Sequence, residues 1–166
     1  MSDPYQEFAQ CLQDLVTVYQ HLLATVEEER VALVAFDIPK ISEINAKKEA
    51  LLEKTSNLEK NRRRLASAIQ RFFKKPIEAT TLLSLAALYD DEKKEYLVTA
   101  HKTLDLLLKR LRELNKIVDG LTRSAQKILD TTIRSVNGGG PASTVYGKQG
   151  TLDSGNIPGK FVSKEV

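Results

Sequence analysis

The stretch LVTAHKTLDLLLKRLRELNKIVDGLTRSAQKILDTTIRS, residues 97–135, decides the fold. Apolar residues recur in it in alternating steps of three and four, and it contains no proline. The row runs through Leu97, Ala100, Leu104, Leu107, Leu111, Leu114, Val118, Leu121, Ala125 and Ile128. A period of 3.5 residues is typical of a long helix that packs against other helices as in a coiled coil. At 1.5 Å per residue this helix would span roughly 55–60 Å, so we expect an elongated architecture.

The apolar character of this row changes along its length. It is rich in leucine at first and then weakens to alanine, threonine and serine, while a second apolar row begins beside it at Ile117. We expect the part up to about Leu114 to hold the helical bundle together. A helix with more apolar rows than its own bundle needs usually has a partner, typically a helix laid into a groove. The predicted binding surface comprises Ile117, Leu121, Ala125, Ile128, Leu129, Thr132, Ile133 and Val136.

Two earlier stretches carry the same pattern and predict an antiparallel helical hairpin. The first runs from Phe8 to Phe36 and the second from Ile41 to Phe72, and Asp37-Ile38-Pro39 separates them. Asp37 suits the N-terminal cap of the second helix. The hairpin register places Glu29, a carboxylate inside the first apolar row, opposite Lys47 or Lys48. We predict a Glu29–Lys48 pair that fixes the register; a catalytic pair is the alternative, but a coiled-coil seam offers no substrate pocket.

The rest of the chain completes an all-α fold. Pro76 ends the second helix, and residues 77–89 predict a short apolar helix. Seven of the eight glycines lie in residues 137–166, where the apolar period stops. We therefore expect an elongated antiparallel bundle of three long helices plus one short helix in residues 1–136, followed by a flexible, Gly-rich tail in residues 137–166.

Composition limits the classes of function. A net charge of +3 is too small to indicate a nucleic-acid partner, and we expect none. The basic run from Lys60 to Lys75 has two interpretations, a solvated helix face or a contact with an acidic protein or nucleic acid. The single cysteine, Cys11, fits a reducing compartment and a small core residue. No apolar run suits a membrane span and no secretory signal is visible, so we expect a soluble cytoplasmic protein without membrane insertion.

Motifs of catalysis and cofactor binding are missing. His21 and His101 stand in no metal-ligand spacing, and no nucleophile motif or dinucleotide fingerprint occurs. The segment Val145 to Gly150 has some likeness to a phosphate loop, but no strand precedes it and no helix follows it. We therefore expect no enzyme, no metal and no cofactor.

Several of these residues form a recognisable pattern. Around the hairpin turn the chain carries Glu29-Arg30-x-x-Leu33, Asp37, Ile41, Ile44, Lys48, Leu51-Leu52, Leu58-Glu59 and Arg62. The long helix adds Leu111-x-x-Leu114-Asn115, and the Gly-rich tail holds Tyr146-Gly147. The sequence resembles the FlgN-type flagellar export chaperones over most of its length. It departs from them at Val118, where many relatives carry a second asparagine.

The resemblance implies a cytoplasmic, non-enzymatic chaperone of flagellar type III export. Such a chaperone keeps the hook–filament junction proteins FlgK and FlgL unpolymerised by binding their C-terminal helical regions with its own C-terminal part. The predicted binding surface would then be the cargo site. A tail tyrosine in this family is associated with docking on the export gate protein FlhA, which makes Tyr146 the candidate here. The alternative function is a coiled-coil structural adaptor or self-associating scaffold, so a homo-oligomer is left open.

Overall fold

The computed structural model describes residues 2–76 and 81–138. Within these ranges the protein has no strand and four helices: α1 (Tyr5–Val34), α2 (Ile38–Phe73), α3 (Leu82–Ala86) and α4 (Asp91–Asn137). The all-α class expected from the sequence is confirmed. The chain divides into two compact units, Met1–Gln126 and Lys127–Val166, so α4 begins in the first unit and ends in the second. From Gly139 onward, the expected tail lies outside the described residues.

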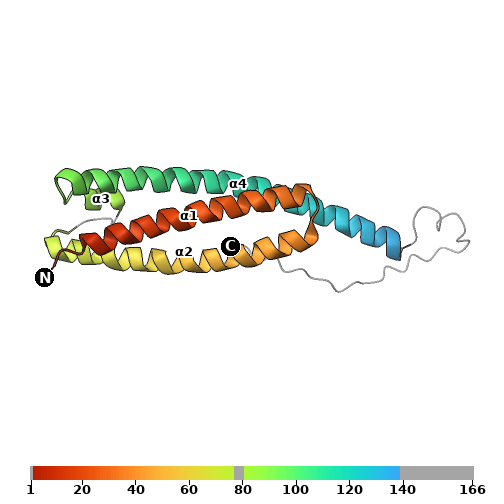
Figure 1. Ribbon diagram of the computed structural model, residues 1–166, viewed down its shortest axis with the longest axis horizontal. Helices are drawn as coiled ribbons and strands as arrows, with labels where there is room; N and C mark the ends of the chain where they lie inside the picture. The colour runs from red at the N-terminus through yellow and green to blue at the C-terminus, as the bar shows by residue number, and fades with distance from the viewer. Residues whose placement is uncertain (1, 77–80, 139–166) are drawn as a thin grey trace, which may run out of the picture. The chain divides into compact units, whose positions relative to one another are not determined.

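In the first unit, α1 and α2 form the antiparallel hairpin that the sequence predicts (Figure 1). The Asp37 side chain caps α2 by accepting a hydrogen bond from the Lys40 backbone amide at 3.1 Å. Pro39 is accommodated because the first amides of a helix have no partner within the helix. Phe36 continues the apolar row in the sequence, yet it lies outside α1, in the turn, with a positive φ of 55°.

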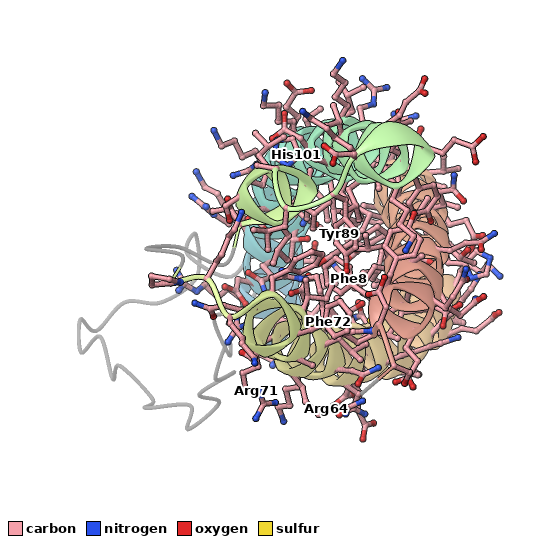
Figure 2. The ribbon with its side chains drawn as sticks, turned by 90° about the vertical axis from the view of Figure 1, so that its left-hand side faces the viewer. Phe8, Arg64, Arg71, Phe72, Tyr89 and His101 are labelled. Carbon is pink, nitrogen blue, oxygen red and sulfur yellow. The ribbon has the colours of Figure 1, made fainter. Side chains whose placement is uncertain are left out.

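The core of the first unit is built around one face of α1. Phe8 and Tyr89 lie toward the interior between the helices, as does Phe72 (Figure 2). The largest fully buried side chains come from all four helices and include Phe8, Leu12, Leu15, Leu22, Leu65, Ile69, Leu85 and Leu97. Burying one such side chain contributes about 1.5–3 kcal/mol relative to leaving it in water. Helix α1 gains most from this burial because α2 and the first part of α4 both pack against it.

A polar and aromatic cluster joins the N-terminus to α4. Asp3 Oδ2 lies 2.7 Å from Lys93 Nζ, and Asp3 Oδ1 accepts hydrogen bonds from the Tyr89 hydroxyl at 2.8 Å and the Tyr5 amide at 3.0 Å. Burial opposes ionisation of Asp3, but these donors outweigh that effect and lower its pKa. The Lys93 ammonium lies over the Tyr5 ring, 4.9 Å from its centroid. This cluster fixes where α4 begins relative to α1.

Helix α3 is shorter than the sequence predicts. The expected helix covered residues 77–89, of which residues 77–80 lie outside the described residues. Thr81 caps α3 by accepting a hydrogen bond from the Ser84 amide at 3.2 Å. After Ala86 the backbone tightens, since Tyr89 donates its amide hydrogen to Ala86 three residues earlier. That tighter turn places the Tyr89 side chain in the core.

Candidate functional site

The first part of α4 is used by its own bundle. Leu97, Ala100 and Leu104 belong to the main core of the first unit. A second, smaller cluster joins Val118 of α4 to Val26 and Leu33 of α1, with Leu114, Leu121 and Ala125 packed against it. The packed part of α4 therefore extends to Ala125, further than the end near Leu114 that the sequence suggested. Leu121 and Ala125, two residues of the predicted surface, are half-buried there.

Ile117 is the predicted residue of the first unit that faces solvent. About half of its side chain is exposed, although Val118 beside it is buried. Ile117 and Leu114 line a shallow hollow of about 340 Å³ between α1 and α4, together with Glu27, Arg30, Arg110 and Glu113. Of these four charged residues, only Arg30 is part of the sequence pattern around the hairpin turn, and nothing in the sequence placed the other three at a site. The spacing along each helix already places Glu27 near Arg30 and Arg110 near Glu113. Only the packing of α4 on α1 brings these two pairs to one hollow.

Charge is balanced around this hollow. The Arg30 guanidinium donates to Glu27, with Arg30 Nε 2.9 Å from Glu27 Oε1, and this bond lowers the Glu27 pKa. The positive charge of Arg110, from α4, acts on Glu27 in the same direction. Glu27 therefore stays ionised, and the rim presents two acids and two bases around an apolar floor of Leu114 and Ile117. Such a rim suits a partner surface with both signs of charge.

In the second unit, the described end of α4 carries an exposed apolar row. All side chains from Lys127 to Asn137 are exposed, and the row includes Ile128, Leu129, Ile133 and Val136. Val136 leaves 77% of its surface in solvent. Steps of three and four place these side chains on one side of the helix. The four residues belong to the predicted surface, and a face of this kind suits an apolar partner.

Two threonines of the exposed stretch bond to the backbone of their own helix. Thr131 and Thr132 donate their hydroxyls to the carbonyls of Lys127 and Ile128, at 2.8 and 2.9 Å. Their hydroxyls are therefore satisfied within the helix. Ile128, Thr132 and Val136 line a shallow hollow of about 420 Å³ along this part of α4. Thr132 thus belongs to the predicted surface as a small residue between larger ones.

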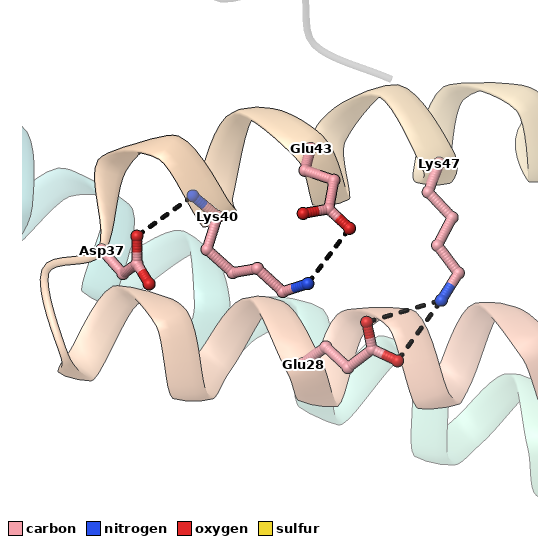
Figure 3. A network of polar contacts seen from close by, with 5 residues as sticks. All are labelled: Glu28, Asp37, Lys40, Glu43 and Lys47. Carbon is pink, nitrogen blue, oxygen red and sulfur yellow. Dashed lines mark hydrogen bonds and ion pairs between the residues drawn. The ribbon is translucent and has the colours of Figure 1, made fainter.

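The hairpin carries two ion pairs that join α1 to α2. Lys48 Nζ lies 2.7 Å from Glu29 Oε2, and only 6% of Glu29 is exposed. One residue earlier on each helix, Lys47 Nζ lies 3.3 Å from Glu28 Oε1 on the exposed surface (Figure 3). The geometry thus brings Glu29 and Lys48 together. That this pair fixes the register remains a prediction.

The other side chains that the sequence analysis considered lie apart from one another. Cys11 is buried in the core, its Sγ 3.5 Å from the Leu58 carbonyl oxygen, and burial raises the pKa of its thiol. Among the described residues, no cluster of histidine, cysteine and carboxylate side chains is suited to a metal ion. Tyr146 lies outside the described residues. Among the described residues, the feature best suited to a partner is the exposed apolar row of α4, which suits the binding of an apolar helix face.

No helix in residues 2–76 and 81–138 has an apolar stretch long enough to cross a membrane.

The comparison with protein families gives a match over most of the chain. The model of the family described as FlgN protein matches residues 1–154, which include all four helices and the predicted surface. Comparison with curated proteins and with solved structures gave no match.

Proposed function

The chain belongs to the FlgN family, which implies the role of a flagellar export chaperone, and we propose that its cargo is the C-terminal helical segment of a hook–filament junction protein. The junction proteins in question are FlgK and FlgL. Binding keeps this segment from polymerising before export and delivers it to the type III export apparatus. The proposed site of action is the cytoplasm. No chemical reaction is involved, so the protein acts by covering and releasing an apolar surface.

The observation that carries this proposal is the exposed apolar row of α4, comprising Ile128, Leu129, Ile133 and Val136. A monomeric protein rarely leaves a continuous apolar row in water without a use for it. Helix-forming cargo segments polymerise through an apolar face of their own, and two such faces cover each other as a helix against a helix. The proposed cargo site also includes Ile117 and Thr132, which are exposed, and Leu121 and Ala125, which are half-buried.

The size of the row sets the strength of binding. A few hundred Å² of buried apolar surface gives several kcal/mol at about 25 cal/mol per Å². Ordering of the two partners takes back part of this free energy. The expected affinity is therefore moderate. A moderate affinity suits this role, because the cargo must be released when it is handed to the export apparatus.

Binding of the isolated C-terminal segment of FlgK or FlgL, measured by isothermal titration calorimetry, tests the proposal. The variant Leu129→Ala/Ile133→Ala removes two exposed side chains of the row, so folding of the free protein is unaffected. We expect its affinity for the segment to fall by about tenfold or more, which corresponds to about 1.4 kcal/mol.

A matched control lies at the hairpin turn. Val34 and Ile38 are also large, apolar and exposed. The variant Val34→Ala/Ile38→Ala therefore removes a similar apolar area from another surface, and its affinity should equal that of the unchanged protein. Equal affinity of all three proteins would refute the proposed cargo site.

Sedimentation of the free protein addresses the scaffold alternative, which predicts a stable self-associated form that buries the row.

Tyr146 is proposed as the residue that docks on the export gate protein FlhA. The support for this role is the resemblance of Tyr146-Gly147 to the tail of the family, and the family match extends to residue 154. The variant Tyr146→Ala should weaken binding of the chaperone–cargo complex to the cytoplasmic domain of FlhA and leave cargo affinity unchanged. If Tyr146→Ala binds FlhA like the unchanged protein, the docking role is wrong.

A further inference from the structure

The C-terminal half of α2 and the two residues that follow it carry a stripe of basic side chains, here called the basic stripe. It consists of six exposed residues: Lys60, Arg63, Arg64, Arg71, Lys74 and Lys75. Residues 60–75 contain no aspartate or glutamate. Within the part of the chain that the structure describes, none of the six forms an ion pair, whereas Arg62 beside them is paired with Glu59 at 2.9 Å. Arg64 donates to the neutral Asn61 side chain at 2.9 Å, which leaves its charge uncompensated. The charges of the basic stripe are therefore available to a partner.

The stripe follows one side of the helix. Steps of three, four and seven residues from Lys60 to Arg63 and Arg64, and on to Arg71, return to the same face of an α-helix. Lys74 and Lys75 follow directly after the end of α2. Figure 2 shows Arg64 and Arg71 on the outer side of α2, away from Phe8 and Phe72 in the interior. From Lys60 to its last residue, Phe73, the helix rises by roughly 20 Å. The charges thus form a straight line rather than a round patch.

The helix dipole explains only part of this charge. Basic residues stabilise the C-terminal turn of a helix, and Arg71, Lys74 and Lys75 lie at that end of α2. The effect fades beyond the last turn, so it gives no reason for Lys60, Arg63 and Arg64. The stripe is also unlike the rest of the chain. Outside residues 60–75 the protein has 18 basic and 22 acidic residues.

Two classes of anionic partner fit the stripe less well than a protein does. A bilayer would be bound by basic side chains together with an apolar face, but Leu65, Ala66 and Ile69 of this segment are buried in the bundle. Single-stranded nucleic acid is bound through basic residues interleaved with exposed aromatic rings. Phe72 and Phe73 are half-buried and pack on each other, and Phe73 also packs on Tyr89.

We propose that the basic stripe of α2 is a docking surface for an acidic helix of another protein. Carboxylates spaced by three and four residues on that helix repeat along its axis with the same pitch as the basic side chains of α2. Guanidinium groups hold carboxylates with two parallel hydrogen bonds, which gives the contact a defined geometry. The stripe shares no residue with the proposed cargo row of α4.

A helical peptide of about 18 residues with glutamates at alternating steps of three and four is the probe. A peptide of the same composition with its glutamates out of phase is the reference. Fluorescence anisotropy with the full chain should show tighter binding of the in-phase peptide and weakening with added salt. The variant Arg63→Gln/Arg64→Gln/Arg71→Gln/Lys74→Gln should bind this peptide about tenfold more weakly or worse, as expected when several charge pairs are lost.

The control variant removes the same charge elsewhere. Lys94→Gln/Lys102→Gln/Arg112→Gln/Lys116→Gln changes four exposed basic residues of α4 and should weaken binding by no more than about twofold, the effect of net charge alone. Equal weakening by the two variants would overturn the proposal. It would also be overturned if the two peptides bound alike, or if oligouridylate or phosphatidylglycerol vesicles bound the stripe more tightly than the in-phase peptide.

Discussion

Lys48 Nζ lies 2.7 Å from Glu29 Oε2, and this ion pair spans the seam between α2 and α1. Its neighbours in the seam are apolar and buried, among them Val26 and Ile44. A buried ion pair adds little net stability, because removal of both charges from water offsets most of their attraction. We expect the pair to disfavour registers in which one charge would lie unpaired in the seam. That role makes the pair a sensitive point for mutation.

Lys48→Met should lower the free energy of unfolding by about 2–3 kcal/mol, because it leaves the buried Glu29 carboxylate without its partner. The double variant Glu29→Leu/Lys48→Leu removes both charges and should recover most of that loss. Urea unfolding followed by circular dichroism measures both values. Lys47→Met breaks the exposed pair with Glu28 and should cost less than about 1 kcal/mol. A double variant as unstable as Lys48→Met would contradict this account.

Asp3→Asn should lower the free energy of unfolding by about 1–2 kcal/mol at pH 7, because the groups that donate to Asp3, from Lys93 and Tyr89, then face a neutral acceptor instead of a carboxylate. The Asp3 pKa is lower in the folded protein than the ordinary value of 3.8. The stabilising contribution is therefore complete above that ordinary value and is lost as the pH falls through the folded pKa. Thermal unfolding of both proteins from pH 7 downward should show the difference shrinking below about pH 4.

The matched control for this prediction is Asp130→Asn. Asp130 is exposed, and the structure gives it no ion pair within the described residues. Its substitution should leave the unfolding temperature nearly unchanged across the same pH range. If the difference between the unchanged protein and Asp3→Asn stays constant down to pH 3, the contribution of Asp3 is not electrostatic.

The Cys11 thiol should react with Ellman's reagent roughly 100-fold more slowly in the native protein than in denaturant. Burial excludes the reagent and raises the thiol pKa, so little thiolate is present at neutral pH. Ser56→Cys places a second thiol on the exposed surface of α2 and should add one fast-reacting equivalent. A fast reaction of the unchanged protein would mean that the N-terminal part of the bundle opens readily.

Gly120→Ala should raise the free energy of unfolding by about 0.5–1 kcal/mol. Gly120 lies within α4, and an added Cβ would meet no atom within 4 Å. Gly138→Ala is the control, since its Cβ would lie 2.8 Å from the Arg134 carbonyl oxygen and should bring no gain. A loss of stability in Gly120→Ala, measured by urea unfolding, would show that this glycine is needed for close packing in the free protein.

The long helices were predictable because the apolar period depends on local sequence alone. The period at residues 97–135 predicted α4, and Asp37 was identified as the cap of α2. Phe36 was placed in the first helical row and lies in the turn instead. The amide of Asp37 reaches back to the Ala32 carbonyl at 3.0 Å, which forces Phe36 into the left-handed region that glycine usually occupies.

The candidate site was predictable only in part. The apolar row at Ile128, Leu129, Ile133 and Val136 followed from spacing, and these residues are exposed. Leu121 and Ala125 have the same spacing, yet they pack on Val26 and Leu33 of α1. The hollow at Ile117 depends on Glu27 and Arg30 of another helix. A periodic sequence shows that a face is apolar, but it does not show which neighbour covers that face.

The sequence by itself determined the number of long helices, the hairpin turn and the apolar faces, because these depend on the spacing of residues along one helix. The tertiary structure alone decided how much of α4 its own bundle covers, since burial depends on where α1 ends beside it. Val118 is therefore buried while Ile117, its neighbour, is exposed. Adjacent residues in a helix point about 100° apart around its axis. The position of the neighbouring helix therefore decides which of the two side chains is buried.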